Sequence, residues 1–223
     1  MSIVTYAINE EKRASLSLLR GDEVFIVGGS NPIYLEQASD PFASAISNVL
    51  VGNEEYAPVF EVYGYAEFAV KEPSLVAVAG RGSVEVRESS GRVKMSLWRA
   101  FPLPPGSVLV VRGNPLYVAF RGLKTKWSGK RRVRPGNGFE ISSVSSNGDL
   151  EDLPARYLPP SFLLEAAKSG VGRNGSASEL SRIVEKIKRH VKLACDAVRR
   201  GAKLVRVRVD GKSVDVWVEE VSP

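Results

Sequence analysis

The sequence predicts a mainly β fold with added helices. Short runs of β-branched and aromatic residues recur through the first 123 residues, separated by Gly, Pro, Asn or Ser. One amphipathic helix with both end signals interrupts these runs near residue 40, and a longer helix followed by a hairpin ends the chain. Many short strands at this spacing are typical of a closed barrel or a sandwich.

Eight runs are predicted as strands: Ile3 to Ile8, Val24 to Val27, Val59 to Tyr63, Leu75 to Ala79, Val84 to Glu88, Val93 to Leu97, Val108 to Val111 and Tyr117 to Phe120. The segment Glu88-Ser-Ser-Gly-Arg92 lies between two alternating runs and predicts a hairpin loop. Residues 102–106 contain three prolines and a glycine, so they predict an irregular crossing outside any central strand.

The helix near residue 40 has clear boundaries. Asp40 suits the N-cap, Pro41 suits the first helical position, and Gly52 suits the C-terminal stop. The apolar residues between them follow the i, i+3, i+4 spacing of one buried stripe: Phe42, Ala45, Ile46, Val49 and Leu50. The polar residues fall on other faces: Ser44, Ser47 and Asn48.

Residues 142–152 are polar and turn-forming, and Leu158-Pro-Pro160 adds a stiff extended piece, so a connection is predicted there. Phe162 to Lys168 can form a short helix before the glycine-rich stretch 170–175 breaks the chain. The predicted organisation is a barrel domain over 1–160, a linker over 161–175 and a helix-hairpin appendage over 176–223.

The appendage is predicted in detail. Ser176 and Glu179 match a capping box that starts a helix over 177–200. Lys203 to Val209 and Lys212 to Glu219 alternate around Asp210-Gly211, which favours a two-residue type I′ turn. That turn makes three cross-strand pairs: Val207 with Val214, Val205 with Val216, and Arg206 with Asp215. A unit of about 45 residues rarely has a sufficient core, so it should pack on the barrel or on another chain.

Composition excludes several classes of protein. No apolar run approaches the roughly 18 residues of a membrane span, and the N-terminus lacks the features of a signal peptide, so a cytoplasmic protein without a membrane partner is expected. Cys195 is the only cysteine and His190 the only histidine. An internal disulfide and a cysteine-based metal cluster are therefore excluded, a catalytic triad and a multi-histidine site are disfavoured, and no metal is predicted. We expect His190 on the surface and Cys195 in helix packing.

The net charge of +6 is concentrated in one segment. Six basic residues fall within eleven positions with no acid among them: Lys124, Lys126, Lys130, Arg131, Arg132 and Arg134. This patch could be a solvated, mobile loop, or it could hold an anionic small ligand or an acidic partner surface. Nucleic-acid binding, with Trp127 stacking on a base, is the least favoured of the three interpretations.

The helix near residue 40 also carries a family resemblance. Asp-x-Phe-Ala from residue 40, then Asn48, Leu50-Val-Gly-Asn53, an acidic pair and Phe60-Glu61, resembles the signature of the biotin-dependent carboxyltransferase family. That family includes allophanate hydrolase subunit 2, the carboxyltransferase part of urea carboxylase and the C component of 5-oxoprolinase. The resemblance extends over roughly residues 25–123 through three further matches: Leu75 to Gly82, the trio Arg99, Phe101 and Gly106, and Tyr117 to Leu123.

The resemblance implies a cyclophilin-like β-barrel and a subunit that acts on a urea, amide or lactam. Transfer of a carboxyl group or activation of an amide needs oxyanion donors and a proton carrier. Residues of suitable type in the matched segments are, as catalytic candidates, Arg81, Glu61 and Arg99 and, as substrate-binding candidates, Asn48, Asn53 and Asp40. Each also has a structural interpretation, as helix cap, turn residue or cross-strand partner.

Two departures from the family pattern point to a partner. The family's N-terminal Gln-Asp-x-Gly-Arg-x-Gly element has no counterpart in Glu11 to Gly29, and its second barrel-like half does not follow Pro160. We therefore expect a hetero-oligomer with a partner subunit of the same family, and a homo-oligomer is the other assembly considered. No cofactor is predicted on this chain, since Val93-Lys94-Met95 is not a biotinylation turn and no Gly-rich phosphate loop occurs. Carboxybiotin or ATP would come with the partner. The alternative is a non-catalytic interaction or regulatory module on the same barrel.

Overall fold

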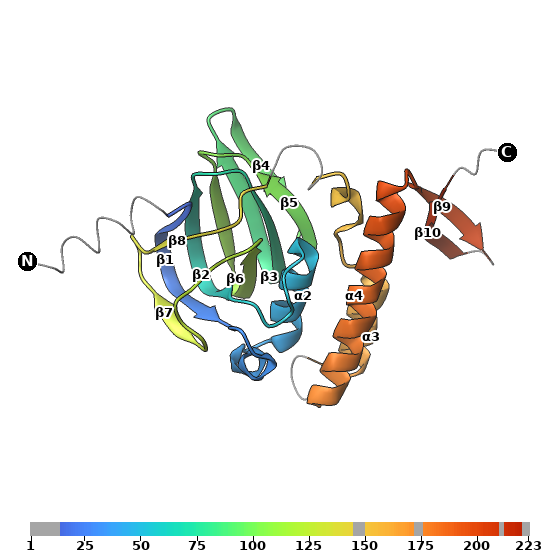
Figure 1. The fold of residues 1–223 in the computed structure, drawn as a ribbon, viewed down its shortest axis with the longest axis horizontal. Coiled ribbons are helices and arrows are strands. Elements are labelled where there is room, and N and C mark those ends of the chain that lie inside the picture. Colours follow the sequence, from blue (N-terminus) through green and yellow to red (C-terminus); the bar gives the residue numbers. More distant parts are fainter. Residues whose placement is uncertain (1–13, 145–149, 172–175, 210–211, 220–223) are drawn as a thin grey trace, which may run out of the picture.

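A computed structural model describes residues 14–144, 150–171, 176–209 and 212–219. One large antiparallel sheet lies beside a layer of helices, and a separate two-stranded hairpin stands at the C-terminal end (Figure 1). The predicted class, mainly β with α, is confirmed. The strands of the large sheet are β1 (Leu16–Val27), β2 (Val59–Val70), β3 (Ser74–Glu88), β4 (Gly91–Met95), β5 (Arg99–Leu103), β6 (Val108–Phe120), β7 (Arg131–Val133) and β8 (Gly138–Phe139).

The remaining elements are η1 (Pro32–Gln37), α2 (Pro41–Val51), η2 (Leu153–Ala155), α3 (Pro160–Lys168), α4 (Ala177–Arg199), β9 (Lys203–Val209) and β10 (Lys212–Val218). Within the described ranges, no helix combines the length and apolar content that crossing a membrane requires. The predicted strand over 3–8 lies outside the described residues.

The sheet curls around an interior rich in phenylalanine. The strand order is β4-β3-β6-β2-β1-β7, while β5 pairs with β3 and β8 pairs with β1. Phe60 lies 4.8 Å from Phe68 and 5.1 Å from Phe139 between ring centroids. Phe101 of β5 belongs to the same buried cluster, so strands from both ends of the sheet fill one core. No hydrogen-bonded ladder among the described strands joins these two ends, so the barrel-like sheet is open here.

The long strands bend along a line of glycines. Gly113 of β6 pairs with Gly64 of β2 and with Gly82 of β3, and register shifts occur beside both pairs. A Cβ at Gly82 would lie 2.1 Å from the Arg112 carbonyl oxygen, so only glycine allows this approach. Each long strand bends without breaking, so each contains two of the predicted short strands. These are 75–79 and 84–88 in β3, and 108–111 and 117–120 in β6.

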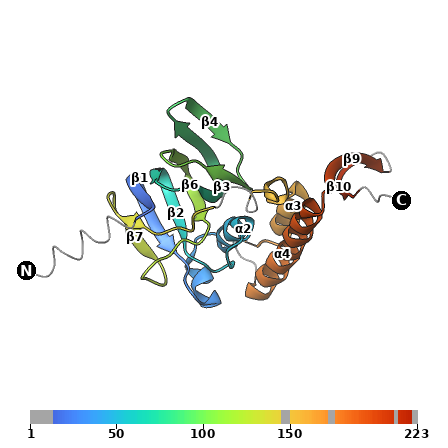
Figure 2. The same cartoon turned by 45° about the horizontal axis from the view of Figure 1, so that its top comes forward.

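Helix α2 has the predicted ends. The Asp40 carboxylate accepts from the Ala43 N–H at 3.0 Å, Pro41 occupies the first turn, and Gly52 ends the helix with φ +83°. Its burial differs from the prediction, because every residue from 42 to 51 is buried and not only the apolar stripe. The reason is that α2 lies between the β3–β6 face of the sheet and α4, as Figure 2 shows. The added helices bury the polar face as well.

The C-terminal helix and hairpin agree with the sequence. The Ser176 Oγ accepts from the Glu179 N–H at 3.2 Å to begin α4, whose apolar side joins the cluster around α2. In the hairpin, Val205 pairs with Val216, Val207 pairs with Val214, and the Arg206 Nε donates to the Asp215 carboxylate at 2.7 Å. The turn at 210–211 lies outside the described residues. Helix α3 occupies much of the predicted 161–175 linker.

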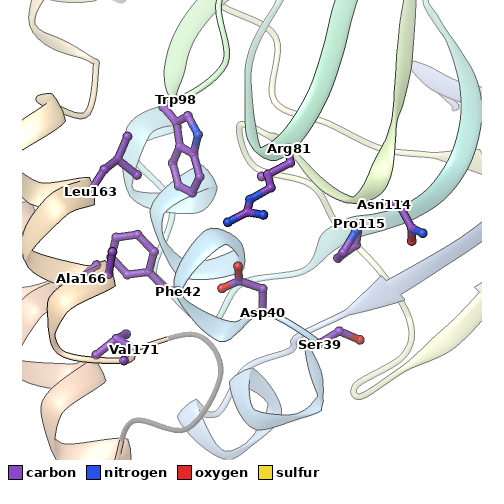
Figure 3. A pocket seen from close by; sticks show the side chains of 13 residues that line it. Ser39, Asp40, Phe42, Arg81, Trp98, Asn114, Pro115, Leu163, Ala166 and Val171 are labelled. Carbon is purple, nitrogen blue, oxygen red and sulfur yellow. The ribbon is translucent and has the colours of Figure 1, made fainter.

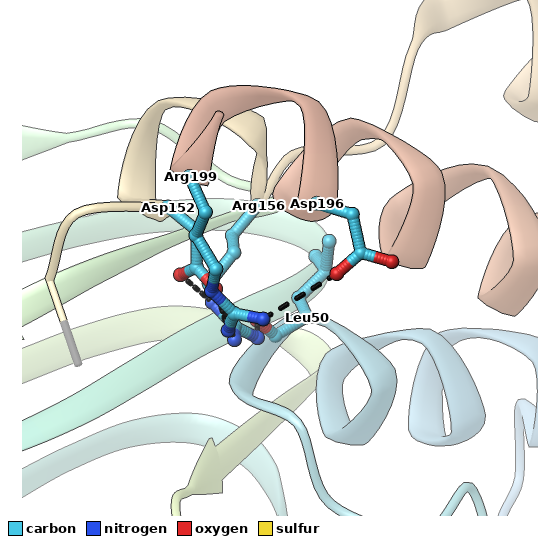
Figure 4. A network of polar contacts seen from close by, with 5 residues as sticks. All are labelled: Leu50, Asp152, Arg156, Asp196 and Arg199. Atoms are coloured by element: carbon cyan, nitrogen blue, oxygen red, sulfur yellow. Dashed lines mark hydrogen bonds and ion pairs between the residues drawn. The ribbon is translucent and has the colours of Figure 1, made fainter. Parts of the chain in front are cut away.

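A buried ion network fixes the end of α4 against α2 (Figure 4). Arg156 binds both carboxylate oxygens of Asp152, at 2.6 and 3.0 Å, and its Nη1 donates to the Leu50 carbonyl at 3.2 Å. Arg199 of α4 reaches the same carboxylate at 2.5 Å. Leu50 is in the last turn of α2, where carbonyls lack helical partners, so the network satisfies that helix end and attaches α4 to it.

Candidate functional site

A cleft of about 610 Å³ opens where α2 begins (Figure 3). Four parts of the chain line it: the turn into α2, the glycine bends of β3 and β6, the turn before β5, and helix α3 with the residues after it. The lining residues are Ser39, Asp40, Phe42, Gly80, Arg81, Trp98, Asn114, Pro115, Leu163, Ala166, Ala167, Gly170 and Val171. Two of the six candidate catalytic and substrate-binding residues, Asp40 and Arg81, are therefore brought together here.

Arg81 is presented by an irregular bend in β3. Gly80 has φ +114°, and a Cβ there would lie 2.7 Å from the Pro115 carbonyl oxygen, so the bend needs glycine before the arginine. The guanidinium group is exposed and points into the cleft (Figure 3). No hydrogen bond or ion pair to it is found among residues 14–144, 150–171, 176–209 and 212–219. Arg81 thus offers a cation and several donors to a ligand.

Asp40 faces the same space from α2. One carboxylate oxygen caps the helix through the Ala43 N–H, and the side chain points toward the Arg81 guanidinium in Figure 3. The start of α2 also carries the positive end of the helix dipole. The cleft therefore presents an acceptor and a strong donor that point toward one another, next to a region that favours negative charge.

Glu61 lies behind the cleft rather than in it. Its side chain is 0% exposed. One oxygen accepts from the Ser39 N–H at 2.8 Å and from the Tyr117 hydroxyl at 2.7 Å, and the other pairs with the Lys130 ammonium at 2.5 Å. Burial by itself would raise the pKa of the Glu61 carboxyl, but Lys130, Tyr117 and Ser39 outweigh it and the pKa is lowered. Glu61 is an ionised anchor for the turn that carries Asp40.

Tyr117 completes this anchor and was not among the predicted site residues. Its hydroxyl accepts from the Asp40 N–H at 2.6 Å while donating to Glu61. Burial, followed by the hydrogen bond to Glu61 and then the Glu61 charge, raises the pKa of Tyr117, so the phenol stays protonated. The signal that could have found it is the sheet register, because Tyr117 pairs directly with Glu61 across β2 and β6.

Asn48 and Asn53 serve the opposite end of α2. The Asn48 amide donates to the Ala57 carbonyl at 2.8 Å, and its oxygen accepts from Asn53 at 3.1 Å. Asn53 also donates to the Phe120 carbonyl at 2.9 Å and accepts from the Gly122 N–H at 2.9 Å. Neither residue lines the cleft. Their amides tie the loop after α2 to the end of β6.

Arg99 is exposed on β5 and does not line the cleft, whereas its neighbour Trp98 does. Trp98 has φ +60°, a left-handed conformation that is uncommon for a bulky residue. Its backbone is held on both sides, by the Val78 carbonyl at 2.8 Å and the Leu158 N–H at 2.8 Å. Its ring packs 5.9 Å from the ring of Phe42. The structure thus fixes an aromatic wall at the cleft, which sequence reasoning missed.

The basic segment 124–134 is partly structured. Lys130 turns inward to Glu61 with only 32% of its side chain exposed, and Lys124 lies 3.6 Å from Glu140. Arg131 stacks on Trp127 at 4.4 Å, and residues 131–133 form β7 on the edge of the sheet. The prediction of a mobile loop is therefore wrong for this strand, because β7 pairs with β1. Lys126, Arg132 and Arg134 remain exposed and form the candidate anion or partner patch.

The single histidine and the single cysteine of the chain both lie on α4. His190 is half-buried against Phe162, with ring centroids 5.2 Å apart, and burial lowers its pKa. Cys195 is buried, and burial raises the pKa of its thiol to about 11. In the part of the chain that the structure describes, no cluster of three or more His, Cys, Asp or Glu side chains is arranged to hold a metal ion.

One known protein family matches a segment of the chain that includes the start of α2 and the β3 bend. Residues 38–125 match the family described as carboxyltransferase domain, subdomain A and B. The predicted resemblance is thereby confirmed for a segment that contains all six candidate catalytic and substrate-binding residues. No curated protein matches the chain.

Three solved structures are similar to part of the chain. TTHA0988 shares 21% identity with a TM-score of 0.49, covering 59% of this chain and 57% of its own. Urea carboxylase of Kluyveromyces lactis shares 14% with a TM-score of 0.46, covering 58% and 14%. Urea amidolyase of K. lactis shares 13% with a TM-score of 0.45, covering 61% and 10%. The chain therefore matches 57% or less of the length of each of these proteins.

Proposed function

We propose that this chain is a carboxyltransferase-type subunit, like allophanate hydrolase subunit 2 or the C component of 5-oxoprolinase, that binds a urea, amide or lactam in the cleft beside α2. The observation that carries the proposal is the convergence of Asp40 and Arg81 on one space, within the segment that matches the family. The other four candidate residues lie outside the cleft.

The chemistry of the pair fits these substrates. A urea, an amide and a lactam each present a carbonyl oxygen that accepts and an N–H group that donates. Arg81 would donate to the carbonyl oxygen and stabilise negative charge that develops on it, and the α2 N-terminus would add to that stabilisation. The Asp40 carboxylate would accept from the substrate N–H, which orients the nitrogen and raises its electron density.

A partner subunit supplies the rest of the reaction in this proposal. The chain has no Gly-rich phosphate loop with a following Lys-Ser or Lys-Thr. Among the described residues, the cleft offers one arginine beside a carboxylate, which suits a neutral amide better than a triphosphate. Carboxybiotin or ATP would therefore come with the partner, where it would provide the carboxyl group or the phosphoryl group.

A second candidate function is a non-catalytic interaction or regulatory module. It is favoured by the way Glu61, Asn48 and Asn53 use their hydrogen bonds on the chain's own backbone and side chains. Under this alternative Arg81→Ala changes no binding, whereas deletion of 176–223 abolishes assembly.

Titration of the full chain with 2-imidazolidinone, a cyclic urea, and 2-pyrrolidinone, a lactam, tests the proposal by protein-observed NMR. A hydrogen bond to a charged group contributes about 1.5–3 kcal/mol, so Arg81→Ala should weaken binding roughly tenfold to a hundredfold. Arg99→Ala is the matched control, because Arg99 is an exposed arginine outside the cleft. Equal effects of the two substitutions, or no binding by either probe, would contradict the proposal.

A further inference from the structure

One side of the cleft is built by a part of the chain outside the family match. Helix α3 and the residues after it follow residue 125, where the match ends. Over the described residues 160–171, their contribution consists of apolar side chains and one glycine: Leu163, Ala166, Ala167, Gly170 and Val171. Among the residues that the structure describes, side-chain hydrogen bonds to a ligand therefore come from the opposite side of the cleft.

This apolar wall is held in place. Ala166 is 3% exposed and belongs to the core around α2. On the other side of α3, Glu165 pairs with Lys186 of α4 at 2.7 Å, and Phe162 packs against His190. Since α4 is itself fixed to α2 by the Asp152 network, the wall keeps its position relative to Asp40 and Arg81.

The aromatic pair at the cleft continues the wall. Phe42 follows Asp40 by two residues and is almost fully buried, and Trp98 stands beside it in its left-handed conformation. In Figure 3, Trp98, Leu163 and Phe42 lie on one side, while Arg81 and Asp40 point into the space next to them. The cleft thus has a polar part for one functional group and a larger apolar part next to it.

We infer that the cleft selects amides, ureas or lactams that carry an apolar substituent, and that α3 is the specificity-determining element. This inference rests on the proposed function, because the polar group is placed by Asp40 and Arg81. An apolar substituent placed against Leu163, Ala167 and Val171 leaves water without desolvating any polar side chain of the wall. Each buried methylene should tighten binding about fourfold.

Two probes with the same polar group test the inference: 2-imidazolidinone and 4-propyl-2-imidazolidinone. For the unmodified full chain we expect the propyl compound to bind about tenfold to fiftyfold tighter by calorimetry or NMR titration. Ala167 is exposed and lines the cleft, so Ala167→Trp should fill the apolar part and bring the ratio of the two affinities close to one. Ser161→Trp is the matched control, because Ser161 is exposed on α3 but does not line the cleft, and it should leave the ratio unchanged.

The binding results distinguish failure of the inference from failure of the proposed function. If the unmodified chain binds the two probes with equal affinity, the inference is overturned while the proposed function stays intact. The same holds if the propyl compound still binds more tightly than 2-imidazolidinone in Ala167→Trp. If Ser161→Trp also abolishes the tighter binding of the propyl compound, the inference is overturned, because that tighter binding would not come from the cleft wall. Binding by neither probe would overturn the proposed function and the inference together. If Ala167→Trp fails to fold, Ala167→Met gives the same test, with a proportionately smaller loss of the ratio.

Discussion

Glu61 connects the sheet to the turn that carries Asp40, so its removal should affect both stability and the cleft. Glu61→Ala leaves three donors without their acceptor: the Ser39 N–H, the Tyr117 hydroxyl and the Lys130 ammonium. Removing one partner of a buried ion pair typically costs about 3–5 kcal/mol. Lys130 is 32% exposed and can turn toward water, so the lower end of that range, about 3 kcal/mol, is expected here.

The assay is thermal and urea unfolding of single and double variants. For a chain of this length, a loss of about 3 kcal/mol lowers Tm by roughly 6–12 °C. Glu61→Gln combined with Lys130→Met in a double-mutant cycle should give a coupling of about 1–3 kcal/mol. The control is Glu140→Gln, whose partner Lys124 has a side chain that is 74% exposed, so its cost should stay within about 0.5 kcal/mol.

The pH dependence of the same variants follows from the lowered pKa of Glu61. A carboxyl whose pKa is lower in the folded state stabilises the fold above its unfolded pKa, near 4.3 for glutamate. That stabilisation is lost as pH falls through the folded value. The stability difference between the unmodified chain and Glu61→Gln should therefore be largest near pH 7 and shrink below about pH 4. Two results would refute the role of Glu61 as an ionised anchor. One is additive stability effects of Glu61→Gln and Lys130→Met, and the other is a stability difference between the unmodified chain and Glu61→Gln that grows on acidification.

Three further predictions concern the fold. Asp152→Ala leaves the buried Arg156 without its carboxylate, so it should cost about 3–5 kcal/mol in urea unfolding, and a change within about 1 kcal/mol would contradict the network's role. Gly82→Ala places a Cβ 2.1 Å from the Arg112 carbonyl oxygen, so it should destabilise by roughly 1–3 kcal/mol or more, and an unchanged Tm would show that the β3 bend does not need glycine. Burial raises the pKa of Cys195 to about 11, so the native thiol should resist maleimide at neutral pH and react only after unfolding; rapid labelling of the folded chain would contradict its burial.

Local signals in the sequence predicted the helices and hairpins well. Asp40, Pro41 and Gly52 set the ends of α2, and Ser176 sets the start of α4, because caps depend on neighbouring residues only. The register of the C-terminal hairpin followed from its alternation in the same way. Continuity of β3 and β6 could not be predicted, because the glycines at 80, 82 and 113 indicate strand breaks until the strands are placed side by side.

The candidate site was predicted in part for a similar reason. Asp40 and Arg81 lie at a helix start and a glycine-flanked bend, where sequence alone indicates exposed polar groups. The sequence predicts Glu61 as a catalytic residue, yet it is buried behind the cleft, where Tyr117, Ser39 and Lys130 hold its carboxylate. Trp98 and helix α3 reach the cleft through tertiary packing between segments distant in the sequence, which no local pattern contains.

Chemical-shift mapping of 2-imidazolidinone on the full ¹⁵N-labelled chain tests the proposed site most directly. Binding at the start of α2 predicts saturable shifts centred on the amides of Asp40, Arg81 and Trp98, with loss of saturation in Arg81→Ala. Shifts confined to the basic segment 124–134, or a response that Arg81→Ala leaves unchanged, would contradict a urea, amide or lactam site there.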